Sequence, residues 1–160
     1  MGQLKAKTLI EKHGFLDADK KTPEHDKIQK WVYKNAYKVI DDLFVKGTET
    51  FEIKQNVWEH EIIETTQNYA SSSKRVVGFI DLYVQYLKPS NKIELAWPEV
   101  YFEIKTSIPS VGELLRQLKY YQTFLGKRRF VVVSSDDSCA DILQEQGFYF
   151  YKYQDSEKLF

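Results

Sequence analysis

Cysteine is nearly absent from this sequence, because only one of its 160 residues, Cys139, is a cysteine. A single cysteine can neither form a disulfide within the chain nor supply a zinc site made of several thiolates, which excludes a secreted disulfide scaffold. Long apolar runs are also missing, since none approaches the roughly 18 residues of a membrane span. Residues 1–22 contain no apolar stretch of signal-peptide length. We therefore expect a soluble, cytoplasmic protein without a membrane partner.

An excess of charge of either sign is missing as well, because 23 Lys and Arg residues balance 23 Asp and Glu residues. This balance excludes a histone-like blanket of positive charge, although a local basic groove remains compatible with it. Hydrophobic residues make up 42% of the chain and aromatic residues 15%, enough for a buried core. The length fits one domain over residues 1–160, and we expect residues 1–23 to form an N-terminal arm.

The spacing of apolar residues predicts the order of helices and strands. Thr22-Pro23-Glu24 is typical of a helix start. Apolar residues then recur every three or four positions from Ile28 to Phe44, which predicts an amphipathic helix of about 20 residues ending near Lys46-Gly47. Strands are predicted at 50–65, 75–87, 99–106, 130–134 and 148–153, helices at 111–126 and 138–146, a polar turn at 68–74 and a loop at 88–98. The order helix, three strands, helix, strand, helix, strand predicts an α/β fold, with helices flanking a central mixed β-sheet.

Three charged residues interrupt the apolar pattern of two predicted strands. Asp81 lies in the strand at 75–87, while Glu103 and Lys105 lie in the strand at 99–106 and share one face of it. Alternation places Asp81 on one face of its strand and both Ile80 and Leu82 on the other. If the two strands are neighbours, the three charged groups converge. Charges within apolar strands are costly unless they are paired or bind a metal, so their convergence indicates a site.

The chemistry of these groups suits phosphodiester hydrolysis. Two carboxylates are hard oxygen donors that can hold Mg²⁺, with Mn²⁺ as a substitute, while the ion keeps waters and contacts a phosphate. Such an ion lowers the pKa of a bound water and stabilises charge on the phosphate. A nearby lysine can orient that water or stabilise the transition state.

These residues resemble a known signature. Gly78-Phe79-Ile80-Asp81 followed by Glu103-Ile104-Lys105 is similar to the PD-(D/E)XK motif of nucleases with the restriction-endonuclease-like fold, although Ile80 stands where that motif has proline. Gln117 and Tyr121, four residues apart on the predicted helix, resemble the Gln-x-x-x-Tyr motif of the RecB-like and related exonuclease branches. The resemblance covers about residues 24–153, including the order of the elements.

The resemblance implies roles for these residues. Asp81 and Glu103 would be metal ligands, and Lys105 would be the catalytic lysine. Gln117 would orient the site or contact the DNA backbone, and Tyr121 would support it.

A glutamate from the first helix often completes such sites. Glu24 matches that place best, and Glu59 and Glu61 of the first strand are the alternatives. Beside the metal-ligand interpretation of Glu24 stands a simpler one, in which its charge stabilises the N-terminus of the helix.

Phe-Glu-Ile-Lys occurs twice, at residues 51–54 and again at 102–105. Roughly one Glu-x-Lys is expected by chance in a chain of this size. The first copy precedes Asp81, whereas the family needs Asp before Glu-x-Lys. We therefore interpret Glu52-Ile53-Lys54 as the coincidental copy.

The sequence thus predicts a Mg²⁺-dependent deoxyribonuclease, either endo- or exonuclease. The alternatives are a non-catalytic nucleic-acid-binding or interaction module on the same scaffold, and a hydrolase of RNA or nucleotides. Four basic residues form either a phosphate-binding patch or a solvated face: Lys119, Lys127, Arg128 and Arg129. The chain is too small for a separate recognition domain, so specificity is expected from DNA structure, from a homodimer or from recruitment by a larger DNA-processing complex.

Overall fold

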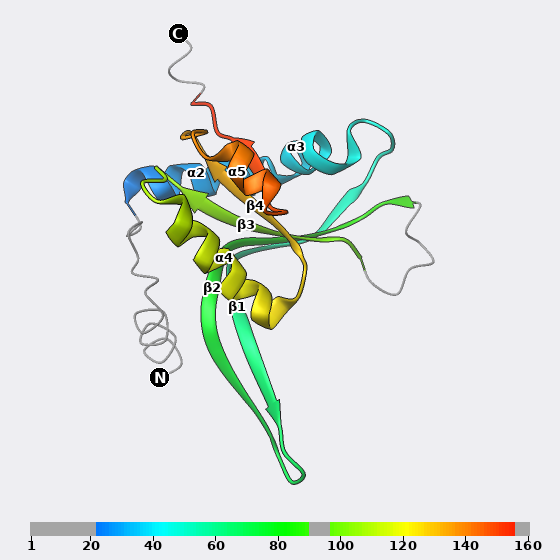
Figure 1. Ribbon diagram of the computed structural model, residues 1–160. Coiled ribbons are helices and arrows are strands. Elements are labelled where there is room, and N and C mark those ends of the chain that lie inside the picture. Colours follow the sequence, from blue (N-terminus) through cyan, green and yellow to red (C-terminus); the bar gives the residue numbers. More distant parts are fainter. Residues whose placement is uncertain (1–21, 90–96, 156–160) are drawn as a thin grey trace.

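The computed structural model describes residues 22–89 and 97–155, so the expected arm at 1–23 lies outside them except for its last two residues. Five strands form one mixed sheet in the order β1-β2-β3-β4-β5 (Figure 1). The strands are β1 (Glu52–Gln67), β2 (Ser72–Leu87), β3 (Glu99–Lys105), β4 (Arg129–Ser134) and β5 (Tyr149–Lys152). β2 is antiparallel to both of its neighbours, β1 and β3, whereas β3, β4 and β5 run parallel to one another.

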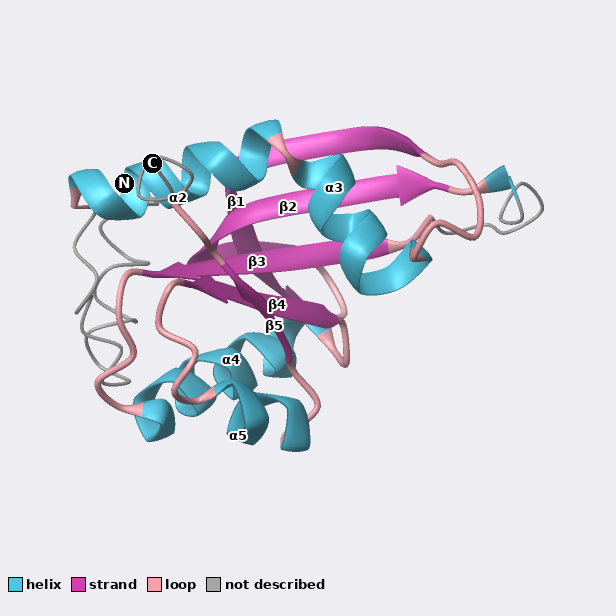
Figure 2. Cartoon of the chain, turned by 90° about the horizontal axis from the view of Figure 1, so that it is seen from above, coloured by secondary structure: helices cyan, strands magenta, loops and turns pink. Residues whose placement is uncertain are grey.

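Helices cover both faces of this sheet (Figure 2). One face carries α2 (Pro23–Lys34), α3 (Ala36–Ile40) and the π-helical segment η1 (Asp41–Val45), and the other carries α4 (Val111–Leu125) and α5 (Ala140–Glu145). The order of elements confirms the α/β class predicted from the sequence. No helix within the described ranges is long and apolar enough to cross a membrane.

Each face of the sheet has its own apolar core. On the α2 face, Ile28 and Val32 pack on the sheet residues Leu82, Val84, Tyr86, Val100, Phe102, Ile104, Val131 and Val133. On the α4 face, Leu114, Leu118 and Tyr121 pack on the sheet residues Ile62, Val77, Ile80, Tyr83, Tyr101, Phe130 and Val132. Because both faces are covered, the middle of β4 is a run of apolar residues, and β3 is apolar except at Glu99, Glu103 and Lys105.

The first helix begins where the sequence predicts, but it is not continuous. Thr22 caps α2 by accepting a hydrogen bond from His25 N–H at 3.2 Å. The helix is interrupted at Asn35, whose side chain donates to Trp31 O at 2.8 Å and whose backbone leaves helical geometry with φ −114° and ψ 24°. Trp31 O thus accepts from both the side chain and the backbone N–H of Asn35, and that N–H also approaches Val32 O, so the Asn35 side chain caps the C-terminus of α2. The segment ends at Lys46 and Gly47, as predicted.

Strands β1 and β2 form a hairpin that is longer than the sheet it belongs to. Each strand has 16 residues, but β3 pairs only with residues 82–85 of β2. Ile62, Val77 and Ile80 still pack under α4, and only the exposed tip at residues 65–75 extends away from the helices, as the hairpin arm (Figure 1). The predicted turn at 68–74 is too wide, because residues 72–74 continue the ladder against residues 65–67. Both faces of the arm tip are exposed, so no core imposes an apolar pattern on this part of the strands.

Strand β2 rotates at Asp81. Residues two apart share a face in a regular strand, yet Leu82 packs in the α2-face core and Ile80 in the α4-face core. The prediction that Ile80 and Leu82 lie on one face is therefore wrong. Glu59 lies opposite Asp81 on β1 and has a φ of 52°, a left-handed conformation that is uncommon without glycine. In both strands of the hairpin, the side chains before and after the level of Asp81 thus point to different faces of the sheet than regular alternation would give.

The contact between Gly78 and Tyr121 yields a prediction about stability. A Cβ atom at Gly78 would lie 3.0 Å from Tyr121 Cε1, so we expect Gly78→Ala to force the Tyr121 ring outward. Overpacking of this kind costs about 1–3 kcal/mol of unfolding free energy, which urea denaturation measures. Gly112→Ala in α4 is the control, because a Cβ there meets nothing closer than 3.8 Å. The control should be neutral or stabilising, and equal stability of both variants would contradict the close contact.

Candidate active site

The candidate site lies where β2 and β3 separate. The ladder between these strands ends at the Leu82–Phe102 pair, and Asp81 and Glu103 are the next residues on the two strands. Beyond this pair, Asp81 Oδ2 accepts a hydrogen bond from Ile104 N–H at 2.7 Å. A carboxylate thus occupies the place of a backbone carbonyl from β2. On its other side β3 stays paired with β4, so only the β2 side of the sheet opens.

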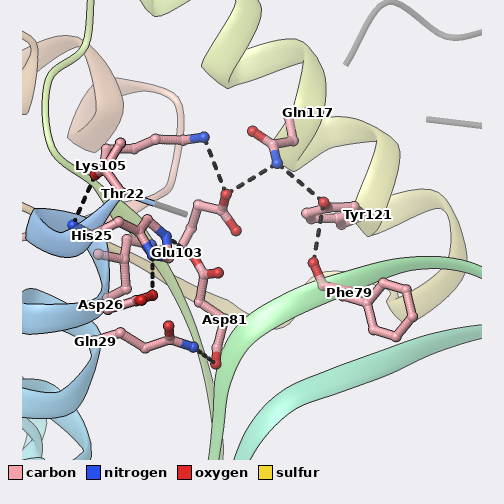
Figure 3. Close-up of polar contacts among 11 residues, drawn as sticks. Thr22, His25, Asp26, Gln29, Phe79, Asp81, Glu103, Lys105, Gln117 and Tyr121 are labelled. Carbon is pink, nitrogen blue, oxygen red and sulfur yellow. Dashed lines mark hydrogen bonds and ion pairs between the residues drawn. The ribbon is translucent and has the colours of Figure 1, made fainter. Parts of the chain in front are cut away.

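Glu103 faces α4 and is nearly buried, with 5% of its surface exposed. Its Oε1 accepts a hydrogen bond from Gln117 Nε2 at 3.0 Å and lies 3.3 Å from Lys105 Nζ (Figure 3). Burial, together with the nearby charge of Asp81, raises the pKa of Glu103 to about 8, and Lys105 partly offsets this rise. Without a further cation, this carboxyl group therefore tends to hold a proton at neutral pH.

A chain of hydrogen bonds ties α4 to the opened strand. Gln117 Nε2 also lies 3.1 Å from Tyr121 Oη, which in turn donates to Phe79 O at 3.3 Å. The spacing of four residues brings Gln117 and Tyr121 to one face of α4, and that face covers β2 and β3 (Figure 3). Gly78 leaves the room for the Tyr121 ring. The structure brings together around this opening the five site residues expected from the sequence: Asp81, Glu103, Lys105, Gln117 and Tyr121.

Helix α2 reaches Asp81 from the opposite face through two residues that the sequence analysis did not predict. His25 Nε2 lies 3.4 Å from Asp81 Oδ2, and Gln29 Nε2 donates to Asp81 O at 2.8 Å. Both side chains are buried, on the same stripe of α2 as Ile28 and Val32. Two polar residues on an otherwise apolar helical stripe are the signal that could have revealed them.

The predicted first-helix ligand lies beside this contact rather than in it. Glu24 is exposed, and its neighbour His25 is the residue of the first helical turn that contacts Asp81. Of the two alternatives, Glu59 is half-buried opposite Asp81 on β1, and Glu61 is exposed. The position of Glu24 near the helix N-terminus agrees with the simpler interpretation that its charge stabilises the helix.

The predicted basic patch is not part of the site. Arg129 pairs with Val100, at the end of β3 opposite to Lys105. Its guanidinium donates to Tyr86 Oη at 2.7 Å and lies 4.6 Å from the centre of the Phe44 ring, so it is engaged in packing. The other three residues are more exposed: Lys119 donates to Gln146, Arg128 donates to Leu125 O and lies near Glu99, and Lys127 precedes it in the loop.

The donors around the opening fit a divalent cation in their chemistry. No three His, Cys, Asp or Glu side chains in the described ranges are grouped closely enough to hold a metal ion as they stand. Asp81 and Glu103 nevertheless offer carboxylate oxygens to one region, the donor type that Mg²⁺ prefers. Gln29 Oε1 is buried beside Asp81 and has no hydrogen-bond partner among the described residues, so it is a free acceptor for a water or a cation.

Comparison with protein-family models, with curated protein sequences and with solved structures finds no match for this chain. Function must therefore be inferred from the geometry around Asp81, Glu103 and Lys105. The opening between β2 and β3 holds two carboxylates, one ammonium group and a side-chain amide. Such a set of groups can bind a cation and position a water for hydrolysis.

Burial of Glu103 predicts a pH dependence of stability in metal-free protein. The pKa of Glu103 rises from about 4.5 in the unfolded chain to about 8 in the fold. Between these values the folded state binds more protons than the unfolded state, so stability should fall as pH rises from 5 to 8. Urea denaturation in EDTA measures this slope. Glu103→Gln keeps an acceptor for Gln117 and removes the titration, so its slope should be flatter and its stability at pH 8 higher. A wild-type slope no steeper than that of the variant would contradict this account.

Proposed function

We propose that this protein is a metal-dependent deoxyribonuclease built on a restriction-endonuclease-like domain. One observation carries the proposal: Asp81 from β2 and the Glu103–Lys105 pair from β3 meet where the two strands separate. The order and spacing of these residues, with Gln117 and Tyr121 on the following helix, are those for which the sequence resembles the PD-(D/E)XK signature. The five-stranded mixed sheet flanked by helices is compatible with that fold.

Asp81 and Glu103 would hold the cation, Mg²⁺ or Mn²⁺, with His25 or Gln29 Oε1 as the added donor from α2. A cation bound by these residues would supply an acidified water as nucleophile and would stabilise charge on the phosphate. Glu103 is suited to this place because a second positive charge, from a bound cation, would favour its ionised form and lower its raised pKa. We assign His25 or Gln29, rather than Glu24, to the role of completing the site from the first helix.

Lys105 would act on the phosphate or on the attacking water. Its Nζ lies 3.3 Å from Glu103 Oε1, and 17% of its side chain is exposed, so the ammonium is held at the site and remains accessible. An ammonium in this position can orient a water or stabilise charge that develops on the phosphate oxygens. Gln117 would keep the Glu103 carboxylate in place, and Tyr121 would keep Gln117 in place.

The complete set of groups favours an enzyme over a binding module. Glu103 is nearly buried on a central strand and Lys105 is partly buried beside it, and ionisable groups in such surroundings are costly to retain. A module that only bound nucleic acid would gain nothing from a carboxylate pair, which repels phosphate. DNA is the proposed substrate, and a homodimer or a larger DNA-processing complex remains our proposal for the source of specificity.

The first activity prediction concerns Asp81. Asp81→Asn keeps an oxygen that can accept from Ile104 N–H but removes the charge of one proposed metal ligand. We expect at least a 100-fold loss of Mg²⁺-dependent cleavage of plasmid and oligonucleotide DNA, while the fold is retained. The matched control is Glu52→Gln in the first Phe-Glu-Ile-Lys copy, whose side chain is 68% exposed. An inactive but folded control, or an active Asp81→Asn protein, would overturn the assignment.

The second activity prediction concerns Lys105. Lys105→Met keeps the length of the side chain and removes its charge, so Mn²⁺ binding measured by calorimetry should persist or become tighter. Single-turnover cleavage should fall about 100-fold, the scale for loss of one transition-state donor or acid–base group. DNA affinity should change little, since phosphate contacts are shared among many residues. Unchanged cleavage would remove Lys105 from the mechanism, and loss of metal binding would make its role structural.

A further inference from the structure

Three large aromatic side chains are exposed along α2, α3 and the neighbouring edge strand β1. The exposed fractions are 43% for Tyr33, 45% for Tyr37 and 40% for Trp58. The rings of Tyr33 and Trp58 meet edge to face with centroids 5.7 Å apart, and Tyr37 stacks on Phe51 at 3.9 Å. Each ring is thus fixed by one neighbour and still presents a large surface to solvent. Fixed, exposed rings are suited to stacking against a ligand because little conformational entropy is lost on binding.

Two lysines alternate with these rings. Lys30 and Lys34 are exposed and lie three and one residues from Tyr33, and Tyr37 follows three residues after Lys34. Helical periodicity places Lys30, Tyr33 and Lys34 on one flank of α2, and the contact of Tyr33 with Trp58 shows that this flank faces β1. Tyr37 of α3 stacks on Phe51, the residue before β1. We name the five residues Lys30, Tyr33, Lys34, Tyr37 and Trp58 the α2 stripe.

The α2 stripe shares its helix with the two residues that contact Asp81. Helix α2 carries His25 and Gln29 to Asp81 at its N-terminal end and the stripe along its β1 flank. On the sheet, Trp58 pairs with Leu82, the residue that follows Asp81. Asn56 Nδ2 donates to Tyr33 O at 2.9 Å, which fixes the flank of the helix to the edge strand. A bound polymer that extends from the site over β1 would therefore contact Trp58 first and the two tyrosines next.

We propose that the α2 stripe is a track for single-stranded DNA that leads to the candidate active site. The proposal rests on the proposed function, since it names the form of the substrate. Aromatic rings stack on bases of any sequence, and lysines beside them contact the phosphates. Bases in a duplex are already stacked and paired, so exposed rings on a flat flank gain nothing from them. Within α2 the rise from Lys30 to Lys34 is about 6 Å, close to two nucleotide steps along one strand.

Binding without cleavage tests the track. Fluorescence anisotropy in EDTA would compare a labelled 20-nucleotide thymidine strand with a mixed-sequence duplex of equal length. Wild-type protein should bind the single strand more tightly. Tyr33→Ala and Trp58→Ala should each weaken that binding by about 5- to 100-fold, the range for losing one stacked base. The double variant Lys30→Gln/Lys34→Gln should reduce the slope of log K against log salt by about 1.4, for two lost phosphate contacts.

The opposite edge strand supplies matched controls. Tyr149 on β5 is 39% exposed and meets Phe44 edge to face at 4.9 Å, and Lys152 on the same strand is 3.1 Å from Asp137. Tyr149→Ala and Lys152→Gln should leave affinity for the single strand unchanged. Thermal melting checks that each variant is folded. Trp58→Phe, which keeps a ring, should retain most of the affinity and lose the fluorescence quenching that a stacked base imposes on Trp58.

The outcomes separate this proposal from the proposed function. Single-strand binding that depends on the α2 stripe, in a protein without nuclease activity, would support the track and reject the nuclease. DNA cleavage with single-strand binding unaffected by the stripe variants would support the nuclease and overturn the track. Tighter binding of duplex than of single strand would also overturn the track, as would equal losses in the β5 controls.

Discussion

The hydrogen bond from Ile104 N–H to the Asp81 carboxylate is the interaction on which the arrangement of the site depends. A buried central strand must satisfy the backbone groups on both of its edges, because an unpaired N–H in the interior costs about 1–3 kcal/mol. β3 could not lose its β2 neighbour without such a penalty. By accepting from Ile104, Asp81 lets β2 leave the sheet and continue as the arm. The same side chain brings its negative charge next to Glu103, so the opening of the sheet and the gathering of charge have one cause.

The arrangement places the Glu103 carboxylate in an electrostatically unfavourable environment, which its neighbours only partly offset. A carboxylate with 5% of its surface exposed has lost nearly all of its hydration, and Asp81 adds repulsion. Lys105 and Gln117 contribute an ammonium and an amide donor to the same oxygen, but the pKa of Glu103 still lies at about 8. The remaining unfavourable electrostatic energy of the Glu103 carboxylate can be relieved either by a proton or by a cation. A site that destabilises its own empty form in this way gains binding energy for the ion that relieves it.

The sequence predicted most helices and strands correctly because their signals are local. It failed where the conformation of a residue depends on contacts that the local apolar pattern does not show. The Thr22 cap, the central strands and the Gln117–Tyr121 pair follow from short-range patterns. The side chain of Asn35 caps the C-terminus of α2, which apolar spacing does not register. The facing of Ile80 reverses at the level where Glu59, between Trp58 and His60 of β1, has a left-handed backbone, and the apolar spacing within β2 carries no signal of that feature of its partner strand. Residue type favours Glu24, because carboxylates are the usual Mg²⁺ ligands, but of the two neighbours only His25 lies on the buried stripe of α2.

The two copies of Phe-Glu-Ile-Lys show why position rather than motif defines this candidate site. In both copies a lysine ammonium lies close to the glutamate two residues before it, at 3.0 Å for Lys54–Glu52 and 3.3 Å for Lys105–Glu103. The first pair lies on an edge strand with 68% of the Glu52 side chain in water, where an ion pair contributes little. The second lies on a central strand with 7% of the Glu103 side chain exposed, where weak screening strengthens every charge that approaches. Identical residues at nearly identical separations thus differ in burial and in electrostatic environment, because of the two pairs only Glu103 and Lys105 lie beside Asp81, in the opening between β2 and β3.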